Sequence, residues 1–335
     1  MTRSAPLEAG ALERRVRELG QRVQNLRAQV GGVILGQEPL IHDLLVAVLA
    51  GGHVLLEGLP GLGKTKLVKT LASSLGLQFA RVQFTPDLMP ADITGTRIVE
   101  EHGGALHFRF ERGPLFANLV LADEINRATP KTQSALLEAM QEGQVTVGGE
   151  THPLPQPFAV IATQNPIELE GTFPLPEAQL DRFLFKLMVT APDHAALVRI
   201  LDSTTGAPAV ELQPLLHGDE VNELHSLARQ VLCGEHLLHA IARLLRASDP
   251  TAADADPETR RLVRYGASPR GGQAIVLAAK VNALLDGRPH VSRADVERCV
   301  LPALRHRVVL SFEAEAEAVT VDRLAERWLA RAFGA

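Results

Sequence analysis

Residues 58–65 read GLPGLGKT, a glycine-rich stretch between the apolar run HVLLE and the helix-like segment KLVKTLASSLG. The stretch matches the phosphate-binding loop pattern, in which a glycine and four residues are followed by Gly63, Lys64 and Thr65. This pattern is expected between a strand and a helix, as it is here. The glycines let successive backbone N–H groups point into one concavity, and the helix N-terminus adds positive potential there. In this interpretation Lys64 reaches the β- and γ-phosphates and the Thr65 hydroxyl ligates Mg²⁺, whereas the alternative is an ordinary glycine turn. The residues assigned to the nucleotide here are Gly58, Pro60, Gly61, Leu62, Gly63, Lys64, Thr65 and Lys66.

Two carboxylates stand at the end of another apolar run, in LVLADEINR at residues 119–127. Asp123 is placed to hold Mg²⁺ together with Thr65, directly or through water. Glu124 is placed one residue further on, where it can polarise an attacking water as a general base. Acidic pairs also occur at strand ends as caps, which is the alternative. Because the guanine-specific pattern NKxD is absent, the sequence favours ATP with Mg²⁺ as the bound cofactor.

Five short apolar runs alternate with helix-like segments and indicate the elements that must position these groups. Such alternation is typical of a parallel α/β sheet. Pro130 stands at a first helical position and Gly143 stands where that helix is expected to end. Two further segments, residues 96–110 and 144–154, read as β-hairpins inserted between strands. The predicted strands are residues 53–57, 79–84, 119–122, 158–163 and 183–189.

Beyond Val189 the strand pattern stops, and helical periodicity continues to the C-terminus. We predict an N-terminal helix packed on the core over residues 1–30, an α/β core over 31–202, a linker over 203–218 and an all-α domain over 219–335. The N-terminal helix has a narrow apolar seam with spacings of four and three. Because the seam spans less than three heptads, we expect the helix to dock on its own domain. The seam residues are Leu12, Val16, Leu19, Val23, Leu26 and Val30.

The composition restricts the class of protein. The 335 residues are 46% hydrophobic with a formal net charge of −5, so the chain has ample core and no overall positive field for nucleic acid or an anionic membrane. Aromatic residues make up only 4% of the chain, which disfavours stacking on single-stranded nucleic acid. No apolar stretch approaches the ~18 residues of a membrane span, and the first residues lack the apolar centre of a signal peptide. The sequence therefore favours a cytoplasmic protein without direct membrane insertion, with its two cysteines as reduced thiols.

Five blocks accompany GLPGLGKT in a fixed order: ILGQE at 34–38, DEINRA at 123–128, ATQNP at 162–166, PEAQLDRF at 176–183 and GASPRGGQA at 266–274. Together they resemble the AAA+ ATPases and specifically the MoxR family, from about Val33 through Arg307. A phosphate-binding loop alone defines a vast class, whereas the ordered set is specific. The resemblance implies a P-loop AAA+ core with a parallel five-stranded sheet, followed by a smaller all-α lid. It also implies that the two hairpins are the helix-2 insert and the pre-sensor-1 insert of this branch.

The resemblance assigns roles to further polar residues. Asn165 in ATQNP would be sensor 1, which orients the attacking water, since an amide can donate to a phosphate while accepting from water. The alternative is a turn-forming asparagine before Pro166. Arg182 in LDRF would be the arginine finger, which enters the neighbouring subunit's active site and neutralises charge on the transferring phosphoryl group. An internal salt bridge to Asp181 or Glu177 is the alternative to this role.

Arg270 in GASPRGGQA would be sensor 2. Ser268 is expected to cap the helix and Pro269 to take its first position, which puts Arg270 in the first turn beside the glycines at 271–272. Two glycines cost such a helix about 1 kcal/mol each relative to alanine, so something must approach this turn closely. A nucleotide bound between core and lid is one explanation, and a tight helix crossing is the other. Gln37 would lie beside the adenine, as the resemblance implies.

The resemblance also implies a working role. It implies a homo-oligomeric ring, hexameric in this family, with a chaperone-like role in maturation, activation or metal and cofactor insertion of client proteins, and a partner that carries a von Willebrand factor A domain. A magnesium-chelatase-like motor subunit and an ATP-binding scaffold without hydrolysis are alternatives. A nucleic-acid motor is disfavoured, because the hairpin tips EEHGG and GGET lack basic residues. His102 and His107 in the first insert have no carboxylate or cysteine in a ligand pattern, so we expect solvated histidines in place of a metal site.

Overall fold

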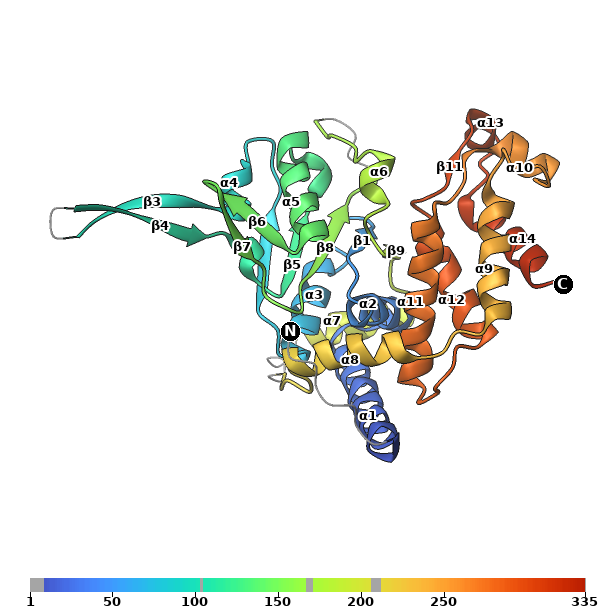
Figure 1. The fold of residues 1–335 in the computed structure, drawn as a ribbon, viewed down its shortest axis with the longest axis horizontal. Coiled ribbons are helices and arrows are strands. Elements are labelled where there is room, and N and C mark those ends of the chain that lie inside the picture. Colours follow the sequence, from blue (N-terminus) through green and yellow to red (C-terminus); the bar gives the residue numbers. More distant parts are fainter. Residues whose placement is uncertain (1–8, 103–104, 167–170, 206–211, 335) are drawn as a thin grey trace.

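The computed structural model describes residues 9–102, 105–166, 171–205 and 212–334. Its central feature is a five-stranded sheet with strand order β2-β5-β8-β1-β9, in which every neighbouring pair is parallel (Figure 1). The predicted parallel sheet is therefore confirmed. The strands are β1 (Val54–Glu57), β2 (Phe79–Gln83), β5 (Leu119–Asp123), β8 (Ala159–Gln164) and β9 (Phe185–Met188).

Side chains of the strands divide between two hydrophobic clusters, one on each face of the sheet. Leu55 and Val120 belong to the cluster that includes α5 (Pro130–Glu142). Leu56 and Leu121 belong to the other cluster, which includes α2 (Glu38–Leu49) and α3 (Lys64–Ser74). Successive side chains of a strand point to opposite faces, so a sheet covered on both faces needs continuous apolar runs. The core also contains α4 (Pro90–Thr94), α6 (Glu177–Leu180), α7 (His194–Thr205) and the 3₁₀ helices η1 (Pro114–Phe116) and η2 (Ile125–Arg127).

The two predicted inserts are both antiparallel hairpins. The first, β3 (Gly95–His102) with β4 (Ala105–Arg112), projects far from the sheet (Figure 1). The second is β6 (Gln144–Val147) with β7 (Glu150–Pro153), and Arg97 of the first forms an ion pair with Glu150 of the second at 2.6 Å. Glycines 103–104 at the first tip and the side chain of His102 lie outside the described residues, and His107 is exposed.

The lid is helical, as predicted, and it also contains a short two-stranded ribbon that the sequence does not predict. The ribbon pairs β10 (Val263–Tyr265) with β11 (Val309–Leu310), and runs of this length are too short for a periodicity to show. Cys233 and Cys299 are free thiols. The helices are α8 (Gly218–Gln230), α9 (Glu235–Ser248), α10 (Pro257–Leu262), α11 (Pro269–Leu285), α12 (Arg293–Leu304), α13 (Phe312–Ala316) and α14 (Val321–Phe333).

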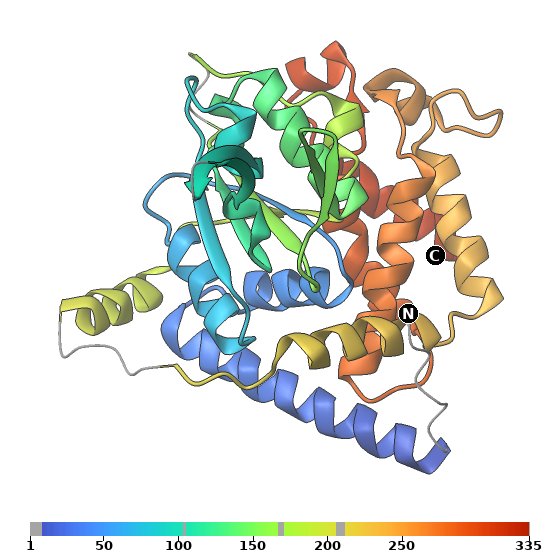
Figure 2. The ribbon, with the colours of Figure 1, turned by 60° about the vertical axis from the view of Figure 1, so that its left-hand side comes forward.

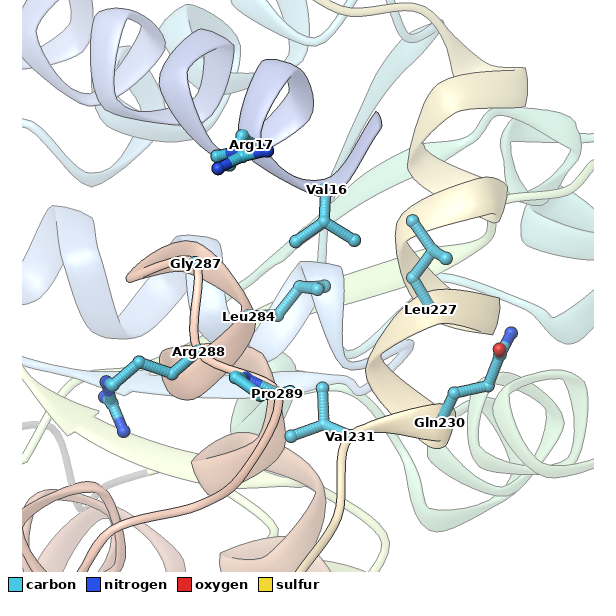
Figure 3. Close-up of a pocket in the computed structure, with 9 residues that line it drawn as sticks. All are labelled: Val16, Arg17, Leu227, Gln230, Val231, Leu284, Gly287, Arg288 and Pro289. Atoms are coloured by element: carbon cyan, nitrogen blue, oxygen red, sulfur yellow. The ribbon is translucent and has the colours of Figure 1, made fainter. Parts of the chain in front are cut away.

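Helix α1 (Ala9–Val33) packs on both parts of the protein: on α2 and α3 of the core and on α8 and α11 of the lid (Figure 2). The seam residues Leu19, Val23, Leu26 and Val30 are buried, and Val16 is half-buried. Beside the seam, α1, α8 and the end of α11 surround an apolar hollow of about 280 Å³ (Figure 3). No helix among the described residues has the combination of length and apolar character that crossing a bilayer requires.

The predicted domain limits at residues 30, 202 and 218 stay predictions. In the structure α7 ends at Thr205 and α8 begins at Gly218. Residues 1–8 of the predicted N-terminal helix and 206–211 of the predicted linker lie outside the described part of the chain.

Candidate nucleotide-binding and hydrolysis site

The predicted phosphate-binding loop joins β1 to the N-terminus of α3. Gly61 and Gly63 have φ values of 81° and 78°, which lie in the left-handed region that glycine adopts without strain. Gly63 is the N-cap, so α3 begins at Lys64. The Lys64 ammonium donates to the carbonyls of Gly58 at 2.6 Å and Leu59 at 2.9 Å, and it therefore spans the loop. The N-terminus of a helix favours an anion, to which its backbone N–H groups can donate. Phosphate binding by this loop stays a prediction.

One cavity of about 430 Å³ brings the loop together with the ends of three strands. The carboxyl ends of parallel strands meet at one edge of a sheet, which is where α/β proteins bind ligands. Besides Pro60–Lys66 of the loop, the cavity is lined by Arg81, Gln83, Asp123, Glu124, Thr163, Gln164 and Asn165. Lys64, Thr65, Asp123, Glu124 and Asn165 thus share one site, and Asn165 is buried there directly after β8.

Asp123 is held from two sides. Thr163 donates its hydroxyl to Asp123 Oδ1 at 2.7 Å, and Arg81 donates from Nη2 to Oδ2 at 2.7 Å. Burial lowers the pKa of Lys64, and the carboxylates of Asp123 and Glu124 oppose that shift. The sequence reasoning did not find Arg81 and Thr163, because only the order of strands brings β2 and β8 to the two sides of β5.

Glu124 has an unusual backbone for a residue with a side chain. Its φ is 58°, in the left-handed region, and its N–H donates to Thr163 Oγ1 at 2.8 Å. The carboxylate accepts hydrogen bonds from Gln83 Nε2 at 2.8 Å and from Arg127 Nη1 at 3.1 Å. Such strained conformations cluster at functional sites, where the surroundings hold them in place. The left-handed backbone and the two hydrogen bonds to the carboxylate hold the Glu124 side chain at the cavity.

The donor set fits magnesium. Mg²⁺ is usually held by one or two carboxylates together with substrate phosphates and waters, and seldom by an all-protein cage. The Thr65 hydroxyl and the Asp123 carboxylate line the same cavity. Among the described residues no group of three histidine, cysteine or acidic side chains gathers in a metal-binding arrangement elsewhere.

Gln37 is not among the residues that line this cavity. It is the N-cap residue of α2 and is buried, with Nε2 donating to the carbonyl of Thr190 at 3.4 Å. Its predicted place beside the adenine stays a prediction.

Arg182 lies in a different cavity, of about 280 Å³, at the junction of core and lid. Its Nη1 donates to the carbonyl of Leu137 in α5 at 2.8 Å, and its Nε is buried without a partner among the described residues. The alternative is a salt bridge from Arg182 to Asp181 or Glu177, and neither pair is present among the described residues. Asp181 pairs instead with Arg307 at 2.7 Å. Arg270 lines the same cavity, with Nη1 3.9 Å from Asp181 Oδ2.

The glycines beside Arg270 are explained by helix packing. A β-carbon on Gly271 would lie 3.1 Å from Leu304 Cδ2 of α12, and one on Gly272 would lie 2.8 Å from Leu245 Cδ1 of α9. The structure therefore supports the tight helix crossing as the reason for the two glycines. The predicted role of Arg270 at a nucleotide stays a prediction. As predicted, Ser268 caps α11, and its hydroxyl accepts from the N–H of Arg270 at 3.2 Å.

Comparisons with known proteins agree with these features. Residues 53–185 match a model of the ATPase family associated with various cellular activities (AAA), and residues 257–328 match the AAA lid domain. The chain is 44% identical over 301 residues to chaperone MoxR1 of Mycobacterium tuberculosis, covering 90% of this chain and 79% of that protein. It is 36% identical to protein MoxR of Paracoccus denitrificans, covering 89% and 92% of the two chains. The crystal structure of a candidate ATPase from Cytophaga hutchinsonii, 39% identical, superposes with a TM-score of 0.90 and covers 97% of this chain and 98% of that one.

Proposed function

Because this chain belongs to the MoxR family of AAA+ ATPases, we propose that it hydrolyses ATP in a homo-oligomeric ring, as a chaperone-like motor acting on client proteins. The observation that carries the proposal is the single cavity shared by the phosphate-binding loop, Asp123, Glu124 and Asn165. The loop supplies anion binding, and the strand ends supply the carboxylates and the amide that hydrolysis needs.

The residues assigned to the nucleotide divide three tasks in this proposal: holding the phosphates, holding the metal and activating the water. The loop amides and Lys64 hold the β- and γ-phosphates, and Thr65 and Asp123 hold the metal. Bound Mg²⁺ neutralises charge that develops on the phosphoryl oxygens. Glu124 polarises the attacking water, which Asn165 orients.

The positions of the two remaining arginines support the proposed ring. Arg182 and Arg270 share a cavity that contains no residue of their own phosphate-binding loop. A neighbouring subunit, packed so that its nucleotide faces this cavity, would receive both guanidinium groups. An arginine supplied in this way is worth about 10³ to 10⁵ in rate in comparable phosphoryl-transfer enzymes. We propose a hexamer.

The β3–β4 hairpin supports a role in contacting protein. Val99 and Phe108 are cross-strand neighbours on one face of the hairpin, and they are 54% and 72% exposed. Leu106 lies on the same face and is 69% exposed. Exposed apolar side chains in a row are typical of interaction sites. We propose maturation, activation or cofactor insertion of a client as the work driven by hydrolysis, with a von Willebrand factor A domain protein as partner.

A mixing experiment tests the proposed ring. Glu124→Gln removes the base but keeps the arginines, and Arg182→Ala removes one arginine but keeps the base. We expect each variant to be nearly inactive alone and the co-assembled mixture to recover ATP turnover. In the mixture, the active site of an Arg182→Ala subunit keeps its own Glu124 and can receive Arg182 from a Glu124→Gln neighbour.

Arg229→Ala is the matched control, since Arg229 is an exposed arginine of α8 and its loss should leave turnover unchanged. Light scattering confirms the size of the assembly, and energy transfer between labelled subunits confirms mixing. Co-assembled mixtures that stay inactive would contradict the action of Arg182 across subunits. Full activity of Arg182→Ala alone would contradict its role in hydrolysis.

A further inference from the structure

Arg307 follows α12 in the lid, and its guanidinium is buried against the core, with the side chain only 3% exposed. A guanidinium has five N–H donors, and here all five have acceptors. Nε donates to Asp181 Oδ1 at 2.7 Å, and Nη1 donates to the carbonyls of Leu184 at 3.0 Å and Ala303 at 2.6 Å. Nη2 donates to the carbonyls of Asp181 at 3.0 Å and Phe183 at 2.6 Å.

Four of these five bonds end on residues 181–184, the segment that carries Arg182. The carbonyl of Phe183 also has His306 Nε2 at 2.9 Å, so the lid holds it twice. Since the carbonyls on both sides of Arg182 are fixed, the backbone from which its side chain starts is fixed as well. From there Arg182 extends to α5, where it bonds to Leu137.

Asp181 links the same contact to Arg270. The Ser268 hydroxyl lies 3.0 Å from each oxygen of the Asp181 carboxylate, and Arg270 Nη1 lies 3.9 Å from Oδ2. Ser268 is the N-cap of α11, so the carboxylate joins the start of that helix to Arg307. The pair of the half-buried Asp181 and the buried Arg307 thus holds both arginines of the cavity in one arrangement.

We propose that Arg307 is a positioning residue for ATP hydrolysis in the adjacent subunit. It aims Arg182 at the neighbouring nucleotide and keeps Arg182 and Arg270 at a fixed spacing. The inference rests on the proposed function, in which Arg182 acts across the subunit boundary. A lysine cannot replace Arg307, because its three donors sit on one atom while the acceptors are arranged around a planar fork. Displacing a catalytic group by about 1 Å can cost about 10²-fold in rate.

The test measures ATP turnover at the active site of one subunit when Arg182 is supplied by its neighbour. Arg182→Ala subunits, which keep the base, are mixed with Glu124→Gln subunits, which keep the finger, and the recovered turnover is the reference. In a second mixture, the Glu124→Gln subunits also carry Arg307→Lys. We expect the ATP turnover of this mixture to be about 10- to 100-fold lower than the reference. Affinity for a fluorescent ATP analogue should be unchanged, because the loop that binds it is intact.

Glu124→Gln with Arg305→Lys is the matched control. Arg305 lies two residues earlier and pairs with Asp322 of α14, so this variant should restore the reference rate. Because Arg307→Lys alters a buried side chain, Asp181→Asn in the Glu124→Gln background loosens the same contact from its other end. It should lower the recovered rate as well.

The outcomes separate the two proposals. If the Arg307→Lys or Asp181→Asn partner co-assembles and restores the full reference rate, Arg307 does not position Arg182, while the proposed function stands. The positioning role also fails if Arg305→Lys lowers the rate as much as Arg307→Lys does. If the parent Glu124→Gln partner restores nothing in a verified mixed assembly, then the action of Arg182 across subunits is wrong, and the role of Arg307 falls with it.

Discussion

Thr163 connects the carboxylate of Asp123 with the backbone of Glu124. Its hydroxyl donates to Asp123 Oδ1 and accepts from the N–H of Glu124. The left-handed conformation of Glu124 costs on the order of 1–3 kcal/mol for a residue other than glycine, so its surroundings must hold it. One hydroxyl thus supports both the residue assigned to Mg²⁺ and the residue assigned to the water.

Thr163→Val keeps the shape of the side chain and removes the hydroxyl. A partly buried N–H without a partner costs about 1–3 kcal/mol, and about 1.4 kcal/mol corresponds to tenfold in rate. We therefore expect kcat for ATP hydrolysis to fall about 10- to 100-fold, measured in steady state with thermal unfolding as the folding check. Thr163→Ser keeps the hydroxyl and should retain most of the activity. Wild-type kcat in Thr163→Val would show that this bridge is not needed.

The site residues predicted from the sequence lie in continuous motifs, whereas those that were not predicted join the site only through the order of strands in the sheet. Lys64 stands in a continuous motif, and Asp123 with Glu124 forms another, so type and spacing along the chain were enough. Arg81 and Gln83 belong to the same cavity only because β2 lies beside β5, with Gln83 in register with Asp123. Their spacing of two on a strand indicates a common face, but not which strand lies next to it.

The elements of the core were predictable for a physical reason. Strands covered on both faces are apolar almost throughout, and proline at a first helical position or glycine at a C-cap often marks a helix end. Pro130 does begin α5, and Gly143 ends it with a φ of 62°. The packing of the lid on the core was not predictable, because it depends on pairs such as Asp181 and Arg307, which lie 126 residues apart.

His306 belongs to this contact between lid and core. It is buried after α12, and Nε2 lies 2.9 Å from the carbonyl of Phe183, which also accepts from Arg307. Burial, followed by the nearby charge of Arg307, lowers the pKa of His306 from 6.5 to about 3. Between these two values the unfolded chain binds a proton that the folded protein does not. Stability is therefore lost as pH falls below about 6.5.

His306→Gln keeps a donor for Phe183 and removes the titrating group. From neutral pH to pH 5 the wild type should lose about 2 kcal/mol more of its free energy of unfolding than this variant. Denaturant unfolding at several pH values, followed by the fluorescence of Trp328, measures the difference. His239→Gln changes an exposed histidine of α9 and should keep the wild-type pH dependence. The same loss in His306→Gln as in the wild type would mean that another group is responsible.

One of the two hydrophobic clusters extends from the sheet into the lid. It contains Leu56 of the sheet, Leu26 of α1, Ile275 of α11 and Trp328 of α14. Helix α1 packs on core and lid together, and its Arg22 is bonded to Glu220 of α8 and to the carbonyl of Leu215. A shared cluster couples the stability of the parts that it joins, so core and lid should not unfold independently.

Leu26→Ala tests this coupling. Leu26 is fully buried, and truncating such a leucine costs about 2–5 kcal/mol. Trp328 is the chain's single tryptophan, so its fluorescence reports the lid, while nucleotide binding reports the core. We expect both signals to shift together, because α1 loses packing against both parts at once. Leu106→Ala on the exposed face of the first hairpin should change stability by less than about 0.5 kcal/mol. A shift of the nucleotide-binding transition alone, with the Trp328 transition unchanged, would show that α1 stabilises the core and leaves the lid independent.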